Sequence, residues 1–383
     1  MSRKLKDNIL RGLTVFASSI SVIVLGLILG FVMVRGARHL SIDMFTTNYW
    51  SENGLVSVAA KPTEPLTVEE EGIYYISDYG FYIKDSRSLE NERKIEIFNV
   101  QDDLIAHSLA TGQAIEPYQL PENIFIETVK IVTDDGNING GTVYGDNAES
   151  LAEKFNTSSS SIEIYYKTMG GGISGSIKAT FMLIGMSILI AFPIGVFAAI
   201  YFNEVAKDNI ITRLFKQLID LLAGVPSIVF GLMGMVVLYP IVSVFSQSGQ
   251  SILLGALTMA VVLLPVIIKT TQEAFIAVPQ ELRHASLSLG ASDTQTIFKV
   301  LLPSSIPGLL SSLILAISRI MGESAALIFT MGRFVNDHPT ITNGGTTLAV
   351  HIWSLLSHEN PNVELASSIA IVILVMVLFL NLS

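Results

Sequence analysis

The 383-residue sequence contains no cysteine, which excludes disulfide bridges and thiolate-bound metals and leaves the cellular compartment open. Charged side chains are also few, at 15% of the chain, against about a quarter in ordinary soluble domains. No G-x-x-x-x-G-K-[S/T] motif occurs, so the chain has no P-loop with which to hold ATP. A Ser/His/Asp order, an H-E-x-x-H motif and a Cys/His cluster are missing too. The sequence therefore gives no indication of a catalytic site or a metal site.

The chain is instead rich in long apolar runs. Half of the residues are hydrophobic, and six runs reach the roughly 20 residues that span the hydrocarbon core of a bilayer. They cover residues 12–34, 177–202, 217–245, 251–272, 305–331 and 364–382. The sequence therefore predicts an all-α membrane domain of six transmembrane helices.

Basic residues around these runs predict the orientation of the chain. The first run follows four basic residues and is about twice as long as the apolar part of a signal peptide. We therefore expect an uncleaved anchor at residues 1–35, with both termini in the cytoplasm. The inner loops then hold five basic residues and the outer loops one, Arg333, as the positive-inside rule requires. The chain stops at Ser383, at the edge of the last run, which leaves a short C-terminal truncation open. The inner basic residues are Lys207, Arg213, Lys216, Arg283 and Lys299.

Residues 36–172 differ from the rest of the chain. Between His39 and Gly170 there are 22 Asp/Glu and 8 Lys/Arg, a net charge of −14, whereas the remainder carries +4. We expect an extracytoplasmic α+β domain here, inserted between the anchor and a five-helix core at 173–383. Its predicted short helices are 102–112 and 147–156, the second opened by Asn147. Its predicted strands, rich in β-branched and aromatic residues, are 72–77, 80–85, 94–100, 124–132 and 161–168.

The predicted cytoplasmic loop 273–304 is not a hydrophilic connector. Residues 281–303 read ELRHASLSLGASDTQTIFKVLLP and place apolar residues in two short stripes at helical spacing. Gly290 lies between the stripes, where a left-handed residue can end a helix. Ser292 or Asp293 can cap the second helix. The pattern predicts a helical hairpin on the inner face of the membrane. On spacing alone it is equally typical of an amphipathic anchor and of a surface that a partner approaches closely.

This loop resembles the E-A-A-x3-G-x9-I-x-L-P signature of permease subunits of ATP-binding-cassette importers, with the spacing kept throughout. Two positions depart from it, since His284 stands in place of Glu and Val300 in place of Ile. In that family the loop docks into a cleft of the ATPase subunit, so the resemblance implies a coupling role here. Because His284 replaces the glutamate of the signature, the salt bridge that this glutamate makes in the family is not expected here. The matching positions are His284, Ala285, Ser286, Gly290, Leu302 and Pro303.

Two further segments closely resemble the phosphate-specific permeases, of which the A-type is nearer. They are DLLAGVPSIVFGLMG at 220–234 and SRIMGESAALIFT at 318–330. The resemblance covers about 172–383, and some members carry an inserted domain after the first span, which fits 36–172. It implies the fold of a type I importer permease in the inner membrane and inorganic phosphate as the substrate. It also implies a second permease, two ATPase subunits that hold the ATP, and an extracytoplasmic phosphate-binding protein as partners.

Two charges interrupt the fifth apolar run, where each costs roughly 2.5–3.5 kcal/mol near the bilayer centre. Arg319 and Glu323 are four residues apart and would pair on one face of a continuous helix. They form either a structural ion pair or part of the substrate path. On that path the guanidinium would bind phosphate and the carboxylate would compete for it. Similar phosphate permeases show this pair, which favours the path.

A proline in the third run predicts a second feature of the path. Pro226 removes a helical hydrogen bond, and the neighbouring Ser227 could offer its hydroxyl to phosphate. A break at membrane depth is tolerated where it lines a cavity. A packing kink explains the same residues equally well.

Three other functions remain open on the sequence. The same kind of permease could carry another oxyanion, such as sulfate or molybdate. An ATP-independent anion channel or carrier is a second alternative, against which the signature loop speaks. A membrane-anchored sensor that uses the acidic domain is a third, and it would leave five spans unexplained.

Overall fold

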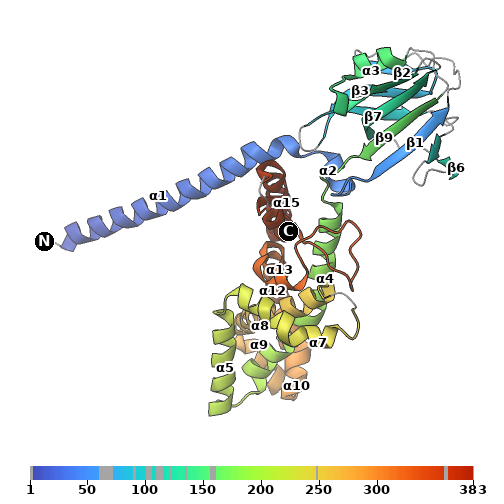
Figure 1. The fold of residues 1–383 in the computed structure, drawn as a ribbon. Coiled ribbons are helices and arrows are strands. Elements are labelled where there is room, and N and C mark those ends of the chain that lie inside the picture. Colours follow the sequence, from blue (N-terminus) through green and yellow to red (C-terminus); the bar gives the residue numbers. More distant parts are fainter. Residues whose placement is uncertain are drawn as a thin grey trace. The chain divides into compact units, whose positions relative to one another are not determined.

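The structure is a computed structural model that describes residues 3–59, 72–88, 92–100, 106–108, 115–118, 120, 123–133, 136–155, 161–246, 249–357 and 361–382. The chain divides into two compact units (Figure 1). Met1–Leu40 and Gly175–Ser383 form a helical unit, and Ser41–Ser174 form a unit built on one sheet. A helical membrane region and a separate sheet unit are therefore both present, as the sequence predicts.

The helical unit contains four helices that are long and apolar enough to cross a membrane as single elements. They are centred on α1 (Arg3–Gly36), α4 (Ser174–Ile200), α8 (Ile252–Ile276) and α15 (Val363–Leu382). The other helices are α5 (Ile210–Ala223), α6 (Ser227–Met233), α7 (Tyr239–Val242), α9 (Gln280–Ser288), α10 (Asp293–Thr296), α11 (Leu302–Ser304), α12 (Ile306–Gly322), α13 (Ala325–Thr330) and α14 (Leu348–Leu356).

Two of the six predicted spans are not single helices. The run 217–245 is divided between α5 and the helix that starts at Ser227, which meet at an angle of 104°. The run 305–331 is divided between α12 and α13, and α12 itself bends by 64° from the helix before it. The membrane unit thus has six crossings only if each bent pair counts as one span. The bend after α5 agrees with the kink or break predicted at Pro226, whereas the unbroken helix predicted at 305–331 is wrong, because hydropathy measures composition and cannot detect a bend.

Three wide π turns interrupt the helices, and two of them have a local cause. They are η3 (Tyr201–Val205), η4 (Gly234–Leu238) and η5 (Ile297–Leu301). Pro240 follows η4 and Pro303 follows η5, each by two residues. Proline has no N–H for the carbonyl four residues earlier, and that carbonyl lies inside the wide turn in both cases. No proline follows η3 at that distance.

Helix α8 forms the centre of the membrane unit, since it is the most buried of the four spanning helices. It is apolar all round, as expected for a helix enclosed by others. Met259 and Leu263 on this helix are fully buried in a cluster with Leu183 of α4, Ile320 of α12 and Leu327 of α13. Between membrane helices such side chains stabilise the unit by close van der Waals packing, because lipid tails are as apolar as the side chains themselves.

Helices α1 and α15 meet near the end of α1 (Figure 1). A Cβ on Gly36 would lie 2.6 Å from the backbone of Ser367, so the glycine lets the two helices approach closely. The Ser368 hydroxyl donates a hydrogen bond of 2.8 Å to the Gly36 carbonyl. A carboxylate oxygen of Glu364 also lies 2.9 Å from Nε2 of His39. The rest of the spanning part of α1 is unburied within this chain.

The sheet unit contains nine strands among the described residues, and every pair is antiparallel. The order is β2-β3-β4-β7-β9-β1-β5-β6, and β8 pairs with β7 off this path. The short elements are η1 (Ala37–His39) in the helical unit, and α2 (Ile42–Thr46) and η2 (Thr142–Tyr144) in the sheet unit. The strands are β1 (Asn53–Ala59), β2 (Ile73–Ile76), β3 (Phe81–Arg87), β4 (Arg93–Val100), β5 (Ala106–Ser108), β6 (Ile115–Tyr118), β7 (Ile124–Thr133), β8 (Gly136–Gly140) and β9 (Ser161–Thr168).

The five strands predicted from the sequence are confirmed as β2, β3, β4, β7 and β9. Alternation explains their burial, because Ile162, Ile164 and Tyr166 of β9 lie on the inner face. Helix α3 (Ala148–Phe155) packs on that core, with the Phe155 ring 5.9 Å from the ring of Phe81. The predicted helix at 147–156 is therefore confirmed as well.

The helix predicted at 102–112 is wrong where the structure describes it. Residues 106–108 form β5, and the other residues of that range lie outside the described part of the chain. Ala106 pairs with Val58 of β1 and with Tyr118 of β6, so sheet partners distant in sequence decide the conformation. The prediction also missed β8, whose GNING sequence has weak strand propensity and pairs with β7 across a hairpin.

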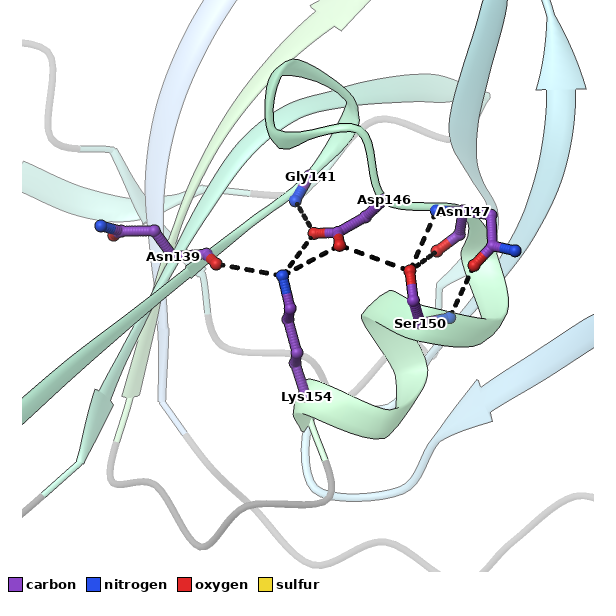
Figure 2. A network of polar contacts seen from close by, with 6 residues as sticks. All are labelled: Asn139, Gly141, Asp146, Asn147, Ser150 and Lys154. Carbon is purple, nitrogen blue, oxygen red and sulfur yellow. Dashed lines mark hydrogen bonds and ion pairs between the residues drawn. The ribbon is translucent and has the colours of Figure 1, made fainter.

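A polar network fixes α3 against β8 (Figure 2). Lys154 donates to both carboxylate oxygens of Asp146, at 2.8 and 2.9 Å, and to the Asn139 carbonyl at 3.2 Å. The Gly141 N–H donates to Asp146 at 2.8 Å, and the Asn147 side chain caps α3 by accepting from the Ser150 N–H. Burial acts to raise the pKa of Asp146, but the hydrogen bonds from Lys154, Gly141 and Ser150 outweigh it and lower the pKa below 3.8.

Asp146→Asn should destabilise the sheet unit in a pH-dependent way. A carboxyl whose folded pKa is depressed contributes stability above its unfolded pKa, and loses it as the pH falls through the folded value. In thermal unfolding of the fragment 41–174, followed by circular dichroism, the variant should lose about 1–3 kcal/mol near pH 7. The gap from the wild type should close below about pH 3.8. Glu52→Gln, an exposed change in the same unit, serves as the control. A pH-independent difference would contradict the ionic role of Asp146.

Candidate functional site

The predicted hairpin exists and consists of α9 and α10. Gly290 has φ +85°, in the left-handed region that favours glycine. The Gly290 N–H donates to the Leu287 carbonyl at 3.0 Å, and the Ala291 N–H donates to the Ser286 carbonyl at 3.2 Å. This is a Schellman ending of α9, with the last carbonyls of the helix satisfied by the turn.

The second helix of the hairpin begins with a reciprocal cap. The Ser292 hydroxyl accepts from the Gln295 N–H at 3.3 Å, and the Gln295 side chain accepts from the Ser292 N–H at 3.1 Å. Of the two capping candidates, Ser292 is the one used. Ser286 and Thr296 are buried and share a hydrogen bond of 2.9 Å that ties the two helices together. Ser286 therefore serves the hairpin itself and is not open to a partner.

The outer face of the hairpin is apolar and uncovered. Leu289, at the turn, is 89% exposed, and Leu282 is 42% exposed. Ala285 lies between them at helical spacing and is exposed, as is its neighbour His284. At the far end of the loop, the last two signature residues differ, because Leu302 is half-buried and Pro303 is exposed.

The first broken span turns at residues 224–226. Helix α5 ends at Ala223, Pro226 is extended with ψ 138°, and α6 begins at Ser227. The N–H groups of Gly224 and Val225 bond back to the last turn of α5, at 3.0 and 3.2 Å, so the break remains internally paired. The predicted path residue Ser227 is therefore the first residue of a short helix, and it is half-buried.

The second break separates the two charges of the fifth run. Helix α12 ends at Gly322, and Glu323 is extended with ψ 126°. Arg319 lies exposed in the last turn of α12, where the helix dipole favours a cation. Glu323 is half-buried and accepts from the Ala326 N–H at 3.3 Å, at the start of α13. No ion pair joins Arg319 to Glu323, both of which the structure describes. The expected pair on one continuous helix is wrong, because the chain leaves the helix between them.

The two short helices that follow the breaks pack against each other. A Cβ on Gly231 of α6 would lie 2.7 Å from the Ala326 carbonyl oxygen of α13. One turn later, a Cβ on Gly234 would lie 2.8 Å from the Thr330 side chain. These glycines let the backbones of α6 and α13 approach closely, as small residues do between membrane helices. The packing therefore brings together the two short helices that follow the breaks in the third and fifth runs.

Sequence reasoning missed two ion pairs near the hairpin. Arg283 of α9 pairs with Glu204 in η3, and Lys269 of α8 pairs with Asp220 of α5 at 2.7 Å. Arg283 entered the prediction only as a basic residue on the inner side. Glu204 and Arg283 are 79 positions apart, so no local pattern in the sequence could have linked them.

Comparison of the sequence with known proteins identifies the family of this chain. Residues 191–383 match the family model described as binding-protein-dependent transport system inner membrane component. The probable ABC transporter permease protein YqgI of Bacillus subtilis is 34% identical over 229 residues, 56% of this chain and 76% of that protein. A phosphate transport system permease protein PstA homolog of Mycoplasma pneumoniae is 35% identical over 52% of this chain and 31% of that protein. The phosphate transport system permease protein PstA of Yersinia pestis is 34% identical over 43% of this chain and 54% of that protein.

Among solved structures, the MetNI methionine ABC transporter in an inward-facing conformation has a TM-score of 0.44 and 18% identity, over 54% of this chain and 92% of that chain. A similarity at this level carries no argument. The family model matches half of the chain, and the chain covers more than two thirds of the Bacillus subtilis permease. The protein therefore belongs to the family of binding-protein-dependent transport system inner membrane components.

Proposed function

We propose that this chain is the A-type permease subunit of an ATP-driven importer of inorganic phosphate. The observation that carries the proposal is the exposed apolar hairpin of α9 and α10, in a chain of this family. Relatives named as phosphate transport system permeases support phosphate as the substrate. The chain is a transport component and not an enzyme, and ATP hydrolysis belongs to a separate subunit.

The proposed assembly contains this chain, a second permease, two ATPase subunits and an extracytoplasmic phosphate-binding protein. Each bent helix pair counts as one span, which gives six crossings. Both termini then lie in the cytoplasm, and residues 36–172 form the extracytoplasmic domain. The basic residues of the inner loops support this orientation. The exposed apolar side chains of α5, such as Ile211 and Leu221, suit lipid or the second permease.

The hairpin is the proposed docking surface for the ATPase subunit. Leu282, Ala285 and Leu289 present an apolar face, and such a face costs free energy in water unless a partner covers it. Gly290 fixes the turn at its tip. His284 lies beside this face as a neutral or charged hydrogen-bonding group, in the place of the signature glutamate. Leu302 and Pro303 connect the hairpin to the next span.

The broken spans are the proposed substrate path. Arg319 supplies a planar guanidinium that can bind two oxygens of an oxyanion, and its exposure within the single chain leaves it available. Glu323 is held about one turn away by its bond to α13, and Ser227 starts the helix that packs on α13. In this arrangement Glu323 positions the break, and Arg319 provides the counter-charge for the anion.

Phosphate-stimulated ATP hydrolysis tests the proposed function. The complete complex, purified with its ATPase and binding-protein subunits and reconstituted into liposomes, should hydrolyse ATP faster with phosphate than with sulfate or molybdate. Labelled phosphate should accumulate only when ATP is supplied. Stimulation by sulfate or molybdate instead would favour a permease for another oxyanion, and uptake without ATP would favour an anion carrier.

Gly290→Ala should weaken coupling without preventing membrane insertion. Nothing lies within 4 Å of a Cβ at this position, so the cost is conformational. A non-glycine residue at φ +85° pays roughly 1–2 kcal/mol, which shifts the turn and the face beside it. Uptake of phosphate per assembled complex should fall, as measured in reconstituted liposomes.

Gly185→Ala is the matched control for this substitution. Gly185 lies in α4, has no neighbour within 4 Å of an added Cβ and does not have a left-handed φ. Its uptake should equal that of the wild type. Wild-type uptake by Gly290→Ala would mean that the left-handed turn has no part in coupling.

Arg319→Gln should reduce phosphate uptake by about tenfold or more while the complex still assembles. A hydrogen bond to a charged group is worth roughly 1.5–3 kcal/mol, and no ion pair with Glu323 is broken by the change. Arg319→Lys should restore little, because Lys lacks the planar fork. Glu323→Gln should keep most of the uptake, since an amide oxygen can still accept from the Ala326 N–H.

Arg213→Gln, which removes an exposed arginine of the same unit, is the control for lost positive charge. Complex yield and labelled phosphate uptake are measured for all four variants. Full uptake by assembled Arg319→Gln complexes would remove Arg319 from the path.

A further inference from the structure

One ion pair joins the hairpin to the end of a spanning helix. Arg283 of α9 donates from Nη2 to Oε2 of Glu204, which lies in the wide turn η3 that continues α4. The other carboxylate oxygen, Oε1, accepts from the Asn203 side chain at 2.7 Å. Both oxygens of Glu204 therefore have partners, as a buried carboxylate requires.

The two side chains of the ion pair differ in burial, as expected if the pair connects the surface hairpin to the protein interior. The Glu204 side chain is 2% exposed and the Arg283 side chain is 38% exposed. The carboxylate is thus fixed inside the protein, and the guanidinium reaches it from the cytoplasmic surface. No proline follows η3 to account for the wide turn, in contrast to η4 and η5. A wide turn at this point re-aims the side chains after α4, among them Glu204.

The position of α9 in the chain allows this contact to transmit a movement from α9 to a spanning helix. Three residues, 277–279, connect α9 to α8, so one end of α9 follows α8 directly. Within the part of the chain that the structure describes, the Arg283–Glu204 pair is the polar contact between α9 and the end of α4. An apolar cluster beneath it contains Ile200 of α4, Phe275 of α8 and Ile297 of η5. A displacement of α9 can therefore reach two spanning helices, through the chain to α8 and through the ion pair to α4.

We propose that the Arg283–Glu204 ion pair transmits the movement of the coupling hairpin to α4, and is thereby needed for ATP hydrolysis to drive transport. This inference rests on the proposed function, because it assumes an ATPase that moves the hairpin. Arg283 and Glu204 are positioning residues, and neither meets the transported anion. Removing the link leaves α9 joined to α8 and able to dock, but it removes the polar connection from α9 to the end of α4.

The test is the ratio of phosphate transported to ATP hydrolysed by the complete complex in liposomes. Glu204→Gln and Arg283→Gln should keep ATP hydrolysis and lower this ratio by about 2- to 30-fold, the range of mutations that weaken coupling between sites. The double variant Glu204→Met with Arg283→Met should lower it similarly. Replacing both members of a buried ion pair by apolar residues strands no charge, so this variant should assemble even if the single variants do not.

The matched control is Asp208→Asn, which breaks another cytoplasmic ion pair of this unit. Asp208 and Arg213 are 2.8 Å apart, but their side chains are 73% and 68% exposed, so the pair should leave the ratio unchanged. The wild-type complex separates the two hypotheses. If it does not couple phosphate uptake to ATP, the proposed function fails. If it does, and the assembled Met/Met complex has the wild-type ratio, the ion pair is only structural and the inference is overturned.

Discussion

The membrane unit depends on one constraint, which is that a backbone in hydrocarbon must find its hydrogen-bond partners inside the protein. Two spans of this chain leave the helix, at residues 224–226 and 323–324, and both breaks meet that constraint with groups of the chain itself. At the second break Glu323 accepts from the N–H of Ala326, and at the other end of α13 the Gln250 amide donates to the Phe329 carbonyl at 3.1 Å. The Ser251 N–H donates to the Thr330 carbonyl at 3.0 Å. The close packing of α6 on α13 covers the two segments against each other. Both of these short helices also contact α8.

Two kinds of contact, apolar packing and ion pairs, hold the helices of the helical unit together. The apolar cluster around Met259 and Leu263 is close-packed and resists deformation, as protein interiors do. Around the start of the hairpin the helices are joined by a second apolar cluster and by the ion pairs of Glu204 and Asp220. Lys269 and Asp220 are about half-exposed, so their pair adds little stability, whereas Glu204 would be costly to leave unpaired. The two ion pairs therefore differ in the free energy lost when one partner is removed. Because Glu204 is buried and Asp220 is not, the Glu204 pair is the one that fixes the geometry.

Local signals predicted the local features of the fold. The glycine at 290 and the serine at 292 determine the hairpin, because a left-handed residue and a cap act over a few positions. Alternation likewise identified five strands of the sheet. The failures have one physical cause. Residues 305–331 carry no charged side chain except Arg319 and Glu323, and nothing within that window indicates that Glu323 bonds to α13 instead of pairing with Arg319. Residues 106–108 form a strand because β1 supplies the edge. Tertiary partners distant in the sequence decided both cases.

The contact between Gly36 and Ser368 has a consequence for synthesis. The hydrogen bond joins residues 332 positions apart, so the contact of α1 with α15 cannot form until nearly the whole chain has been made. At about 5–20 residues per second, α1 waits roughly 15–65 s before α15 is available. During that time the lipid bilayer must solvate an apolar helix whose serine-facing glycine is uncovered. The sheet unit, encoded between them, can fold while α1 waits. Closure of the helical unit is thus a late event, timed by the ribosome rather than by the strength of the contact.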